Sequence, residues 1–243
     1  MAGFLRSLYV VVSGQTIFTI ASLAMVAVRL TRGAEGRRIC QEVIGGWAGD
    51  AILKVLNIDL VVHRDGDWPD YPCFYMSNHS SALDLPVLMA LRPPNARSFM
   101  KEQYRWYGPL GLVTMLTGTL YTAPQDDHDR RVARFKQAEE LLRRTSESLY
   151  GSPEGTRVQG GEFGPFNRGV FHIVTKLGMP IVPMIILIPE EAAQGVGVQV
   201  NSGEIHVHVG EPISTDDWTE EDLDANKEKV RDHFVAWKMA MLK

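Results

Sequence analysis

His79 and Asp84 are the residues whose types and spacing best suit acid–base chemistry in this sequence. The histidine follows an apolar run, residues 72–76, that predicts a buried strand, and residues 85–91 after the aspartate predict a short helix. A histidine between a strand and a helix lies at the carboxyl edge of an open α/β sheet, where such sheets place ligands. A loop that folds back brings the carboxylate to the imidazole, where it fixes the tautomer and stabilises the imidazolium. The predicted chemistry is a general base that activates a substrate hydroxyl.

Plainer interpretations exist for the same stretch. Ser80 or Ser81 is expected to cap the helix rather than act as a nucleophile. A surface histidine, with an aspartate in the first turn of a helix where the helix dipole favours it, needs no catalytic role. A second stretch, Gly-Ser-Pro-Glu-Gly-Thr-Arg at residues 151–157, favours the catalytic interpretation over this plainer one.

This second stretch has the properties of a substrate-binding loop. Pro153 stiffens the backbone, and Gly155 permits a positive φ or a close approach of substrate. Glu154 can hold a neighbouring basic group or accept a hydrogen bond from an acceptor hydroxyl. Arg157 offers a planar fork of donors that suits a phosphate.

Together the two stretches, N-H-x-x-x-x-D at residues 78–84 and P-E-G-T-R at residues 153–157, resemble motifs of the glycerophospholipid acyltransferase family. They match its 1-acyl-sn-glycerol-3-phosphate (lysophosphatidic acid) acyltransferase type, and weaker matches continue to near Pro212. The resemblance implies that His79 is the catalytic base and that Asp84 orients it. It also implies a set of substrate-binding residues: Lys101, Glu154, Gly155, Thr156 and Arg157.

The second family motif, roughly G-x-x-F-I-D-R, is altered in this chain. Gly118 and Tyr121 match its glycine and aromatic positions, but the acidic and basic positions fall on Ala123 and Pro124. In the family that basic residue lies close to the glycerophosphate.

Two hypotheses follow for the acceptor. Either Lys101 and Arg157 suffice for a phosphate, helped by Arg130 or Arg131 from the next helix, or the acceptor carries a different head group. Because both remaining basic positions match the family, lysophosphatidic acid is the favoured acceptor.

The activity implied is transfer of an acyl group from acyl-CoA or acyl-ACP to the free hydroxyl of a lysolipid, giving phosphatidic acid from 1-acyl-glycerol-3-phosphate. This reaction needs no metal and no cofactor beyond the thioester co-substrate. The partners implied are membrane lipids and the lysophospholipid, with no nucleic acid. The alternatives are acylation of another lysolipid, hydrolysis of the thioester, and a non-catalytic lipid-binding or scaffold protein of the same fold.

The fold expected is α/β, with a central mixed, largely parallel sheet flanked by helices. Residues 58–243 form the acyltransferase domain in this interpretation, and residues 1–57 form a two-helix membrane-docking element. Further strands are expected at 58–63, 98–101, 118–123, 149–150, 180–186 and 204–209, and further helices at 126–148, 167–177 and 220–241.

The N-terminal region predicts association with a membrane. Residues 7–28 carry no charge, which is long enough for a helix to cross a bilayer core of about 30 Å. A polar break at residues 13–16 equally allows an interfacial or re-entrant helix, and a cleaved signal peptide is the least favoured alternative. Residues 37–57 predict a second helix with one apolar face. A basic excess in residues 1–38 suits anionic head groups on the cytoplasmic face of the inner or plasma membrane.

Composition adds few constraints. The chain has 243 residues and a net charge of −4, which gives no indication of nucleic-acid binding. Its two cysteines, Cys40 and Cys73, have apolar neighbours and predict buried reduced thiols rather than a disulfide or a metal site. His206 and His208 share one face of a predicted strand, but no third metal ligand is evident.

Overall fold

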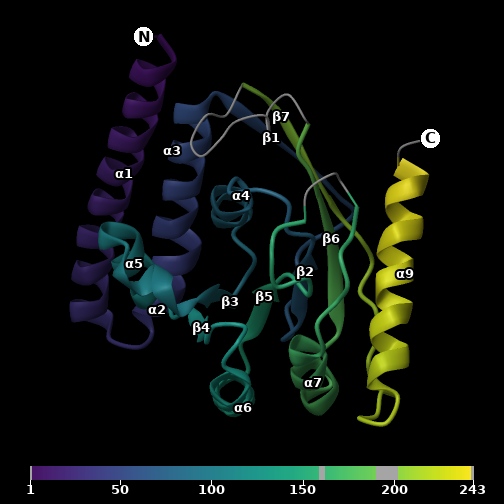
Figure 1. Cartoon of the computed structure of the whole chain (residues 1–243). Coiled ribbons are helices and arrows are strands. Elements are labelled where there is room, and N and C mark those ends of the chain that lie inside the picture. Colours follow the sequence, from purple (N-terminus) through teal and green to yellow (C-terminus); the bar gives the residue numbers. More distant parts are fainter. Residues whose placement is uncertain (1, 159–161, 190–201, 242–243) are drawn as a thin grey trace.

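A twisted seven-stranded sheet forms the centre of the protein, and helices cover both of its faces (Figure 1). The computed structural model describes residues 2–158, 162–189 and 202–241. The strands lie in the order β1-β7-β6-β2-β5-β3-β4, and every neighbouring pair is parallel except β6 and β7. The prediction of a mixed, largely parallel sheet is therefore confirmed.

The strands agree closely with the apolar runs of the sequence. Their bounds are β1 Ile58–Arg64, β2 Phe74–Ser77, β3 Ala96–Lys101, β4 Leu120–Thr122, β5 Ser148–Gly151, β6 Ile181–Leu187 and β7 Gly203–Val209. β2 and β5 are buried throughout, and six of the seven residues of β6 are buried. Side chains alternate between the faces, as strand geometry requires: Phe74 and Met76 join one core cluster, and Tyr75 joins another.

Two layers of helices enclose this sheet. On one face lie α6 His128–Thr145, α7 Arg168–Leu177 and α9 Leu223–Met241, which share a core cluster with β2, β5 and β6. On the other face, α4 Asp84–Leu91 packs with the N-terminal helices, and α5 Gly108–Leu116 follows a short 3₁₀ turn, η2 Glu102–Trp106. Residues of α4, α5 and the N-terminal helical region in this layer line the cavity described below.

The N-terminal region is helical, as predicted. α1 Ala2–Arg32 leads through a short turn, α2 Gly36–Arg38, and a π-helical stretch, η1 Ile39–Gly45, into α3 Gly46–Leu56. α3 ends at Asn57, whose φ of 56° is the left-handed conformation that stops a helix. α1 packs on α3 and α5, and α3 packs closely on α4. Gly49 makes that last contact possible, because a Cβ there would lie 2.5 Å from the backbone nitrogen of Ala90.

A buried ion-pair network joins the N-terminal helices to the sheet. Arg37 of α2 bonds to Glu147 just before β5, with 2.6 Å between Arg37 Nε and Glu147 Oε1, and Arg97 of β3 bonds to the other carboxylate oxygen. Arg37 also donates to Asn95 Oδ1 at 2.6 Å. Arg37 belongs to the basic excess of residues 1–38, but its side chain is only 6% exposed and is paired inside the protein.

Candidate active site

Three neighbouring strands deliver the predicted site residues to one edge of the sheet. His79 follows the end of β2, the Glu154–Arg157 loop follows β5, and Lys101 is the last residue of β3. Because β2, β5 and β3 are adjacent and parallel, their carboxyl ends open on the same side. Residues far apart in the sequence are brought together in this way.

His79 and Asp84 form the pair that their spacing predicts. His79 Nδ1 lies 2.6 Å from Asp84 Oδ2, with the imidazole 34% exposed and the carboxylate 4% exposed. A carboxylate only accepts, so Nδ1 donates its proton and the Nε2 lone pair is left available for substrate. The same Asp84 oxygen accepts the backbone N–H groups of Ser80 at 2.9 Å and Ser81 at 3.0 Å, which holds the carboxylate in place.

The predicted serine cap on α4 is wrong. The helix begins at Asp84, and the residue before it, Leu83, offers no side-chain cap. Ser81 Oγ instead accepts the N–H of Leu83 at 3.2 Å, within the turn that carries Asp84 back to His79. The physical reason is that the carboxylate of Asp84, rather than a serine hydroxyl, accepts the N–H groups of Ser80 and Ser81.

The main chain of His79 is held on both sides by the P-E-G-T-R loop. Its N–H donates to Glu154 Oε2 at 2.7 Å, and its carbonyl accepts the N–H of Val158 at 2.9 Å. The preceding residue, Asn78, joins β2 to β6 through a double hydrogen bond with the backbone of Ile186, at 3.0 Å and 2.8 Å. The histidine therefore stands on a backbone fixed from two neighbouring strands.

Glu154 is buried and positions other groups. It is 4% exposed, and its second oxygen accepts the N–H of Gly164 at 2.8 Å. Burial raises the pKa of Glu154, while the N–H groups of Gly164 and His79 act in the opposite direction. This placement favours a positioning role, and direct contact between Glu154 and the acceptor stays a prediction.

Gly155 adopts the positive φ that its position in the loop suggested. Its φ is 68°, and a Cβ there would lie 2.8 Å from Nδ2 of Asn167. Asn167 Nδ2 donates to the carbonyls of Pro153 and Glu154 at 3.1 Å and 2.7 Å, so the turn is closed by a side chain from the start of α7. Thr156, half-buried, continues this turn toward the exposed Arg157.

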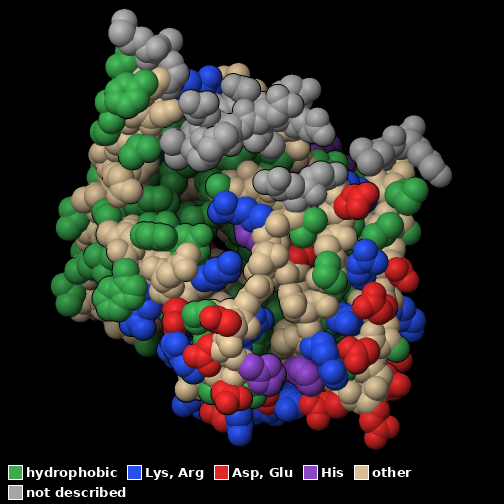
Figure 2. Space-filling model, in the orientation of Figure 1, with side chains coloured by type: hydrophobic (Ala, Val, Ile, Leu, Met, Phe, Trp, Pro, Cys, Tyr) green, Lys and Arg blue, Asp and Glu red, His purple; other side chains and the backbone are tan. Residues whose placement is uncertain are grey.

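Two cations stand at the mouth of the site. Arg157 and Lys101 are exposed, and among the described residues neither has a hydrogen-bond or ion-pair partner. Arg157 adjoins Val158, whose N–H binds the carbonyl of His79. Figure 2 shows basic side chains beside a hollow, between a hydrophobic region over α1 and α5 and a charged region over α6, α7 and α9. Both cations are exposed on segments that follow the carboxyl ends of neighbouring strands.

The altered second motif supplies no cation of its own. Ala123 is buried and Pro124 is exposed after the end of β4. Arg130, proposed above as a substitute, donates to both oxygens of Glu102 at 2.8 Å and 2.9 Å and also pairs with Asp127. It is a weak candidate for a phosphate, because it would have to leave these carboxylates. Arg131 is half-buried on α6.

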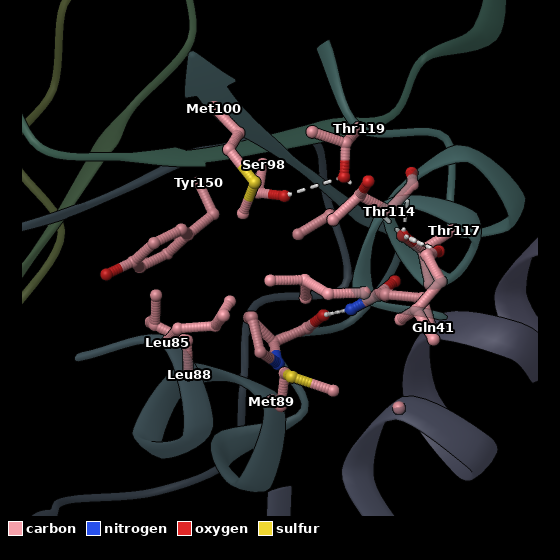
Figure 3. Close-up of a pocket in the computed structure, with 15 residues that line it drawn as sticks. Gln41, Leu85, Leu88, Met89, Ser98, Met100, Thr114, Thr117, Thr119 and Tyr150 are labelled. Carbon is pink, nitrogen blue, oxygen red and sulfur yellow. Dashed lines mark hydrogen bonds between the residues drawn. The ribbon is translucent and has the colours of Figure 1, made fainter. Parts of the chain in front are cut away.

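An apolar cavity of about 80 Å³ lies between the sheet and the helical layer of α4, α5 and η1 (Figure 3). Three of its lining residues, Leu85, Met100 and Tyr150, are sequence neighbours of Asp84, Lys101 and the P-E-G-T-R loop. Tyr150 also bonds through its hydroxyl to Ser77, at the end of β2. The sequence did not predict this cavity, because its walls come from five separate segments. Residues of β6 do not line it; they are buried in the core.

Asn78, the buried Glu154 carboxylate and the cavity are the features that sequence reasoning missed or understated. Asn78 is the first residue of the N-H-x-x-x-x-D motif, and its place in that motif could have indicated a role in the site. Within the described ranges, no group of three or more His, Cys, Asp or Glu side chains is arranged to hold a metal ion.

Comparison with known proteins agrees with this geometry. The Acyltransferase family model matches residues 59–187, which include β2, the His79–Asp84 pair and the P-E-G-T-R loop. This chain belongs to the Acyltransferase family. The match also spans Lys101 and the altered second motif, so all the predicted site residues lie within the family region.

Curated relatives carry a common name. The 1-acyl-sn-glycerol-3-phosphate acyltransferase alpha of Homo sapiens is 30% identical over 67% of this chain and 57% of its own length. The 1-acyl-sn-glycerol-3-phosphate acyltransferase of Limnanthes douglasii is 32% identical over 79% of this chain and 67% of its own length. The chain thus spans between about half and two thirds of the length of these relatives.

A solved structure shares the fold. The crystal structure of the 1-acyl-sn-glycerophosphate (LPA) acyltransferase PlsC from Thermotoga maritima superposes with a TM-score of 0.80 over 98% of this chain and 97% of that chain. The two sequences are 21% identical. This likeness confirms the fold class.

Proposed function

We propose that this protein transfers an acyl group from a thioester, acyl-CoA or acyl-ACP, to the free hydroxyl of 1-acyl-glycerol-3-phosphate, forming phosphatidic acid. The observation that carries the proposal is the His79–Asp84 pair, which leaves Nε2 free and lies at the same edge of the sheet as Arg157 and Lys101, both unpaired among the described residues. The names of the relatives support the same acceptor.

The reaction follows from the hydrogen bonds around His79. Nε2 takes the proton of the acceptor hydroxyl while its oxygen attacks the thioester carbonyl carbon, and Asp84 stabilises the imidazolium through Nδ1–H. The tetrahedral oxyanion collapses, the C–S bond breaks, and the thiolate receives the proton from Nε2. The N–H groups of His79, Ser80 and Ser81 already donate to Glu154 and Asp84, so these three do not serve as donors to the oxyanion.

Arg157 and Lys101 are the groups proposed to bind the acceptor phosphate. Charge-assisted hydrogen bonds contribute about 1.5–3 kcal/mol each, which supports a preference for an anionic acceptor. Pro124, in place of the family arginine, favours a second candidate, acylation of a lysolipid with another head group. A comparison of kcat/KM for lysophosphatidic acid and for other lysolipids decides between these two acceptors.

The proposal includes membrane association through α1. The most buried apolar residues of α1, Ile17, Ala21 and Met25, lie in its second half, where Ser22 Oγ also donates to the carbonyl of Pro109 at 3.1 Å. In the first half, Val10 is partly buried against the cluster of Leu53 and Leu56, while most of its neighbours are exposed. The part that precedes Ile17, residues 4–16, is about 20 Å long as a helix, shorter than the roughly 30 Å core of a bilayer. Although the whole of α1 is long and apolar enough to cross a membrane, we infer that it enters one leaflet, on the cytoplasmic face.

An acyltransferase assay tests the proposal. Purified protein, labelled acyl-CoA or acyl-ACP and a panel of lysolipids should give acylated product, with kcat/KM highest for lysophosphatidic acid. Arg157→Ala should lower kcat/KM for that acceptor by roughly tenfold or more and leave neutral lysolipids little changed. Equal losses for all acceptors would mean that Arg157 holds the loop instead. Release of free fatty acid without acylated lipid would favour a thioesterase.

A further inference from the structure

The peptide group between Asn78 and His79 is hydrogen-bonded at both of its polar ends. Its N–H, which belongs to His79, donates to Glu154 Oε2 at 2.7 Å. Its carbonyl, which belongs to Asn78, accepts the hydroxyl of Ser77 at 3.0 Å. Because a peptide group is planar, bonds at both ends fix the rotation of the whole plane. That rotation sets the direction in which the side chain of His79 leaves the backbone.

Ser77 is itself hydrogen-bonded to Tyr150. The serine has a single hydroxyl proton, and it goes to the Asn78 carbonyl, which can only accept. In the bond between the two hydroxyls, Tyr150 is therefore the donor and Ser77 Oγ the acceptor. All three residues are buried. A directed chain of hydrogen bonds thus runs from Tyr150 through Ser77 to the peptide group of His79.

The environment of Tyr150 suits a permanent donor. Burial raises the pKa of Tyr150 well above its ordinary value, and the charge of Asp84 acts in the same direction, so the hydroxyl keeps its proton far into alkaline pH. Figure 3 shows this hydroxyl pointing away from Gln41 and Thr119. The ring of Tyr150 therefore lines the cavity, while its hydroxyl serves the turn that carries His79.

One segment of the chain supplies both contacts to this peptide group. Tyr150 lies in β5, and Glu154 lies in the loop that follows β5. β5 pairs with β2, the strand that ends at Ser77. The segment thus fixes the carbonyl through Tyr150 and the N–H through Glu154.

We propose that Tyr150 and Ser77 are positioning residues for the catalytic base, acting on His79 through the Asn78 carbonyl. The proposal rests on the acyl transfer proposed above and extends the role of Glu154 to the opposite end of the same peptide group. Neither hydroxyl touches the reacting atoms. Their effect is to hold His79 Nε2 in line with the acceptor hydroxyl.

Removal of the two hydroxyls tests this proposal. Tyr150→Phe and Ser77→Ala should each lower kcat for acyl transfer roughly tenfold or more with KM little changed, because a displaced base affects the transition state more than binding. Since Tyr150 acts only through Ser77, the double variant should be no slower than Ser77→Ala alone. The pH at which kcat is half-maximal should not move, because His79 Nδ1 keeps its bond to Asp84.

Tyr75→Phe is the matched control. Tyr75 is a buried tyrosine of β2, and its hydroxyl makes no hydrogen bond among the described residues, so its removal should leave kcat unchanged. Circular dichroism and thermal unfolding should show that every variant is folded at the assay temperature. Three results would overturn the proposal: a wild-type kcat in Tyr150→Phe, losses that multiply in the double variant, or a raised KM with kcat intact.

A magnetic resonance measurement makes the test independent of the acyltransferase proposal. Labelling histidine alone with a heavy nitrogen isotope gives seven backbone N–H signals, and the one missing from His79→Ala protein belongs to His79. Tyr150→Phe should shift that signal, and Tyr75→Phe should leave it in place. If the wild-type protein transfers no acyl group, the proposed function fails, but this shift still decides the inference. A His79 signal unmoved by Tyr150→Phe contradicts it.

Discussion

At the scale of single residues, the catalytic pair gives the first prediction. His79→Ala should lower kcat by roughly 10²–10⁴-fold, because a positioned base contributes about that much, and Asp84→Asn should lose much of the rate. Both variants should keep the wild-type circular dichroism spectrum. Labelled acyl transfer to lysophosphatidic acid is the measurement. Normal turnover by the His79→Ala protein would end the general-base assignment.

Glu154 gives a second prediction, which separates positioning from substrate contact. Its two oxygens accept from His79 and Gly164, and a glutamine would set its NH₂ group against one of these N–H donors. Glu154→Gln should therefore be nearly as harmful as Glu154→Ala. We expect kcat to fall roughly 10²-fold with KM little changed, because a misplaced base affects the transition state more than binding.

The contrasting outcome for Glu154 is equally clear. If its carboxylate binds the acceptor, KM for lysophosphatidic acid should rise in both variants while kcat with saturating acceptor stays near normal. Replacing Glu162, an exposed residue of the neighbouring loop, by glutamine is the matched control and should change neither constant.

At the scale of elements, the Arg37–Glu147–Arg97 network ties the N-terminal helices to the sheet. Burial alone would raise the pKa of Glu147, but hydrogen bonds from Arg97 and Thr145 and the charge of Arg37 outweigh it and hold the pKa below its ordinary 4.5. A carboxyl with a lowered folded pKa adds stability above its unfolded pKa and loses it as pH falls through the folded value. The window of loss therefore begins near 4.5 and extends downward.

The third prediction follows from the lowered pKa of Glu147. Glu147→Gln should lower the free energy of unfolding at neutral pH by about 3–5 kcal/mol, because the buried Arg37 and the partly buried Arg97 lose a shared partner. The difference between wild type and variant should shrink as the pH is lowered below about 4.5, since the wild-type carboxyl then becomes neutral too. Thermal unfolding at a series of pH values measures this. Glu140→Gln, on the exposed side of α6, should show no such pH dependence.

α1 carries the fourth prediction. Leu8 and Val12 are 49% and 55% exposed and lie one helical turn apart in the first half of the helix. Replacing both by glutamine should weaken binding to anionic vesicles by roughly tenfold or more, since each buried aliphatic side chain contributes about 1.5–3 kcal/mol. Co-sedimentation measures it. Val132→Gln is the control, because Val132 is equally exposed but lies on α6. Unchanged sedimentation of the double variant would contradict docking through α1.

At the scale of the whole molecule, local patterns predicted the strands, the helices and the residues of the site. β2, β6 and β7 are apolar or alternating runs, and His79, Asp84 and Arg157 stand in short motifs. Such signals lie within a few neighbouring residues. The partners of Glu154 and the burial of Arg37 depend on contacts between segments far apart in the chain. A single sequence holds no record of those contacts, so the structure was needed to find them.

The pairing of β1 has a consequence for how this protein is made. β1 is the outer strand of the described sheet and pairs only with β7, which lies about 140 residues later in the chain. A ribosome adding about 5–20 residues per second needs roughly 7–28 seconds to supply that partner. During this interval α1 and α3 have left the ribosome while the strand that follows them has no neighbour. On the docking proposed for α1, nascent chains that end before Gly203 should already bind membranes while β1 remains open to proteases.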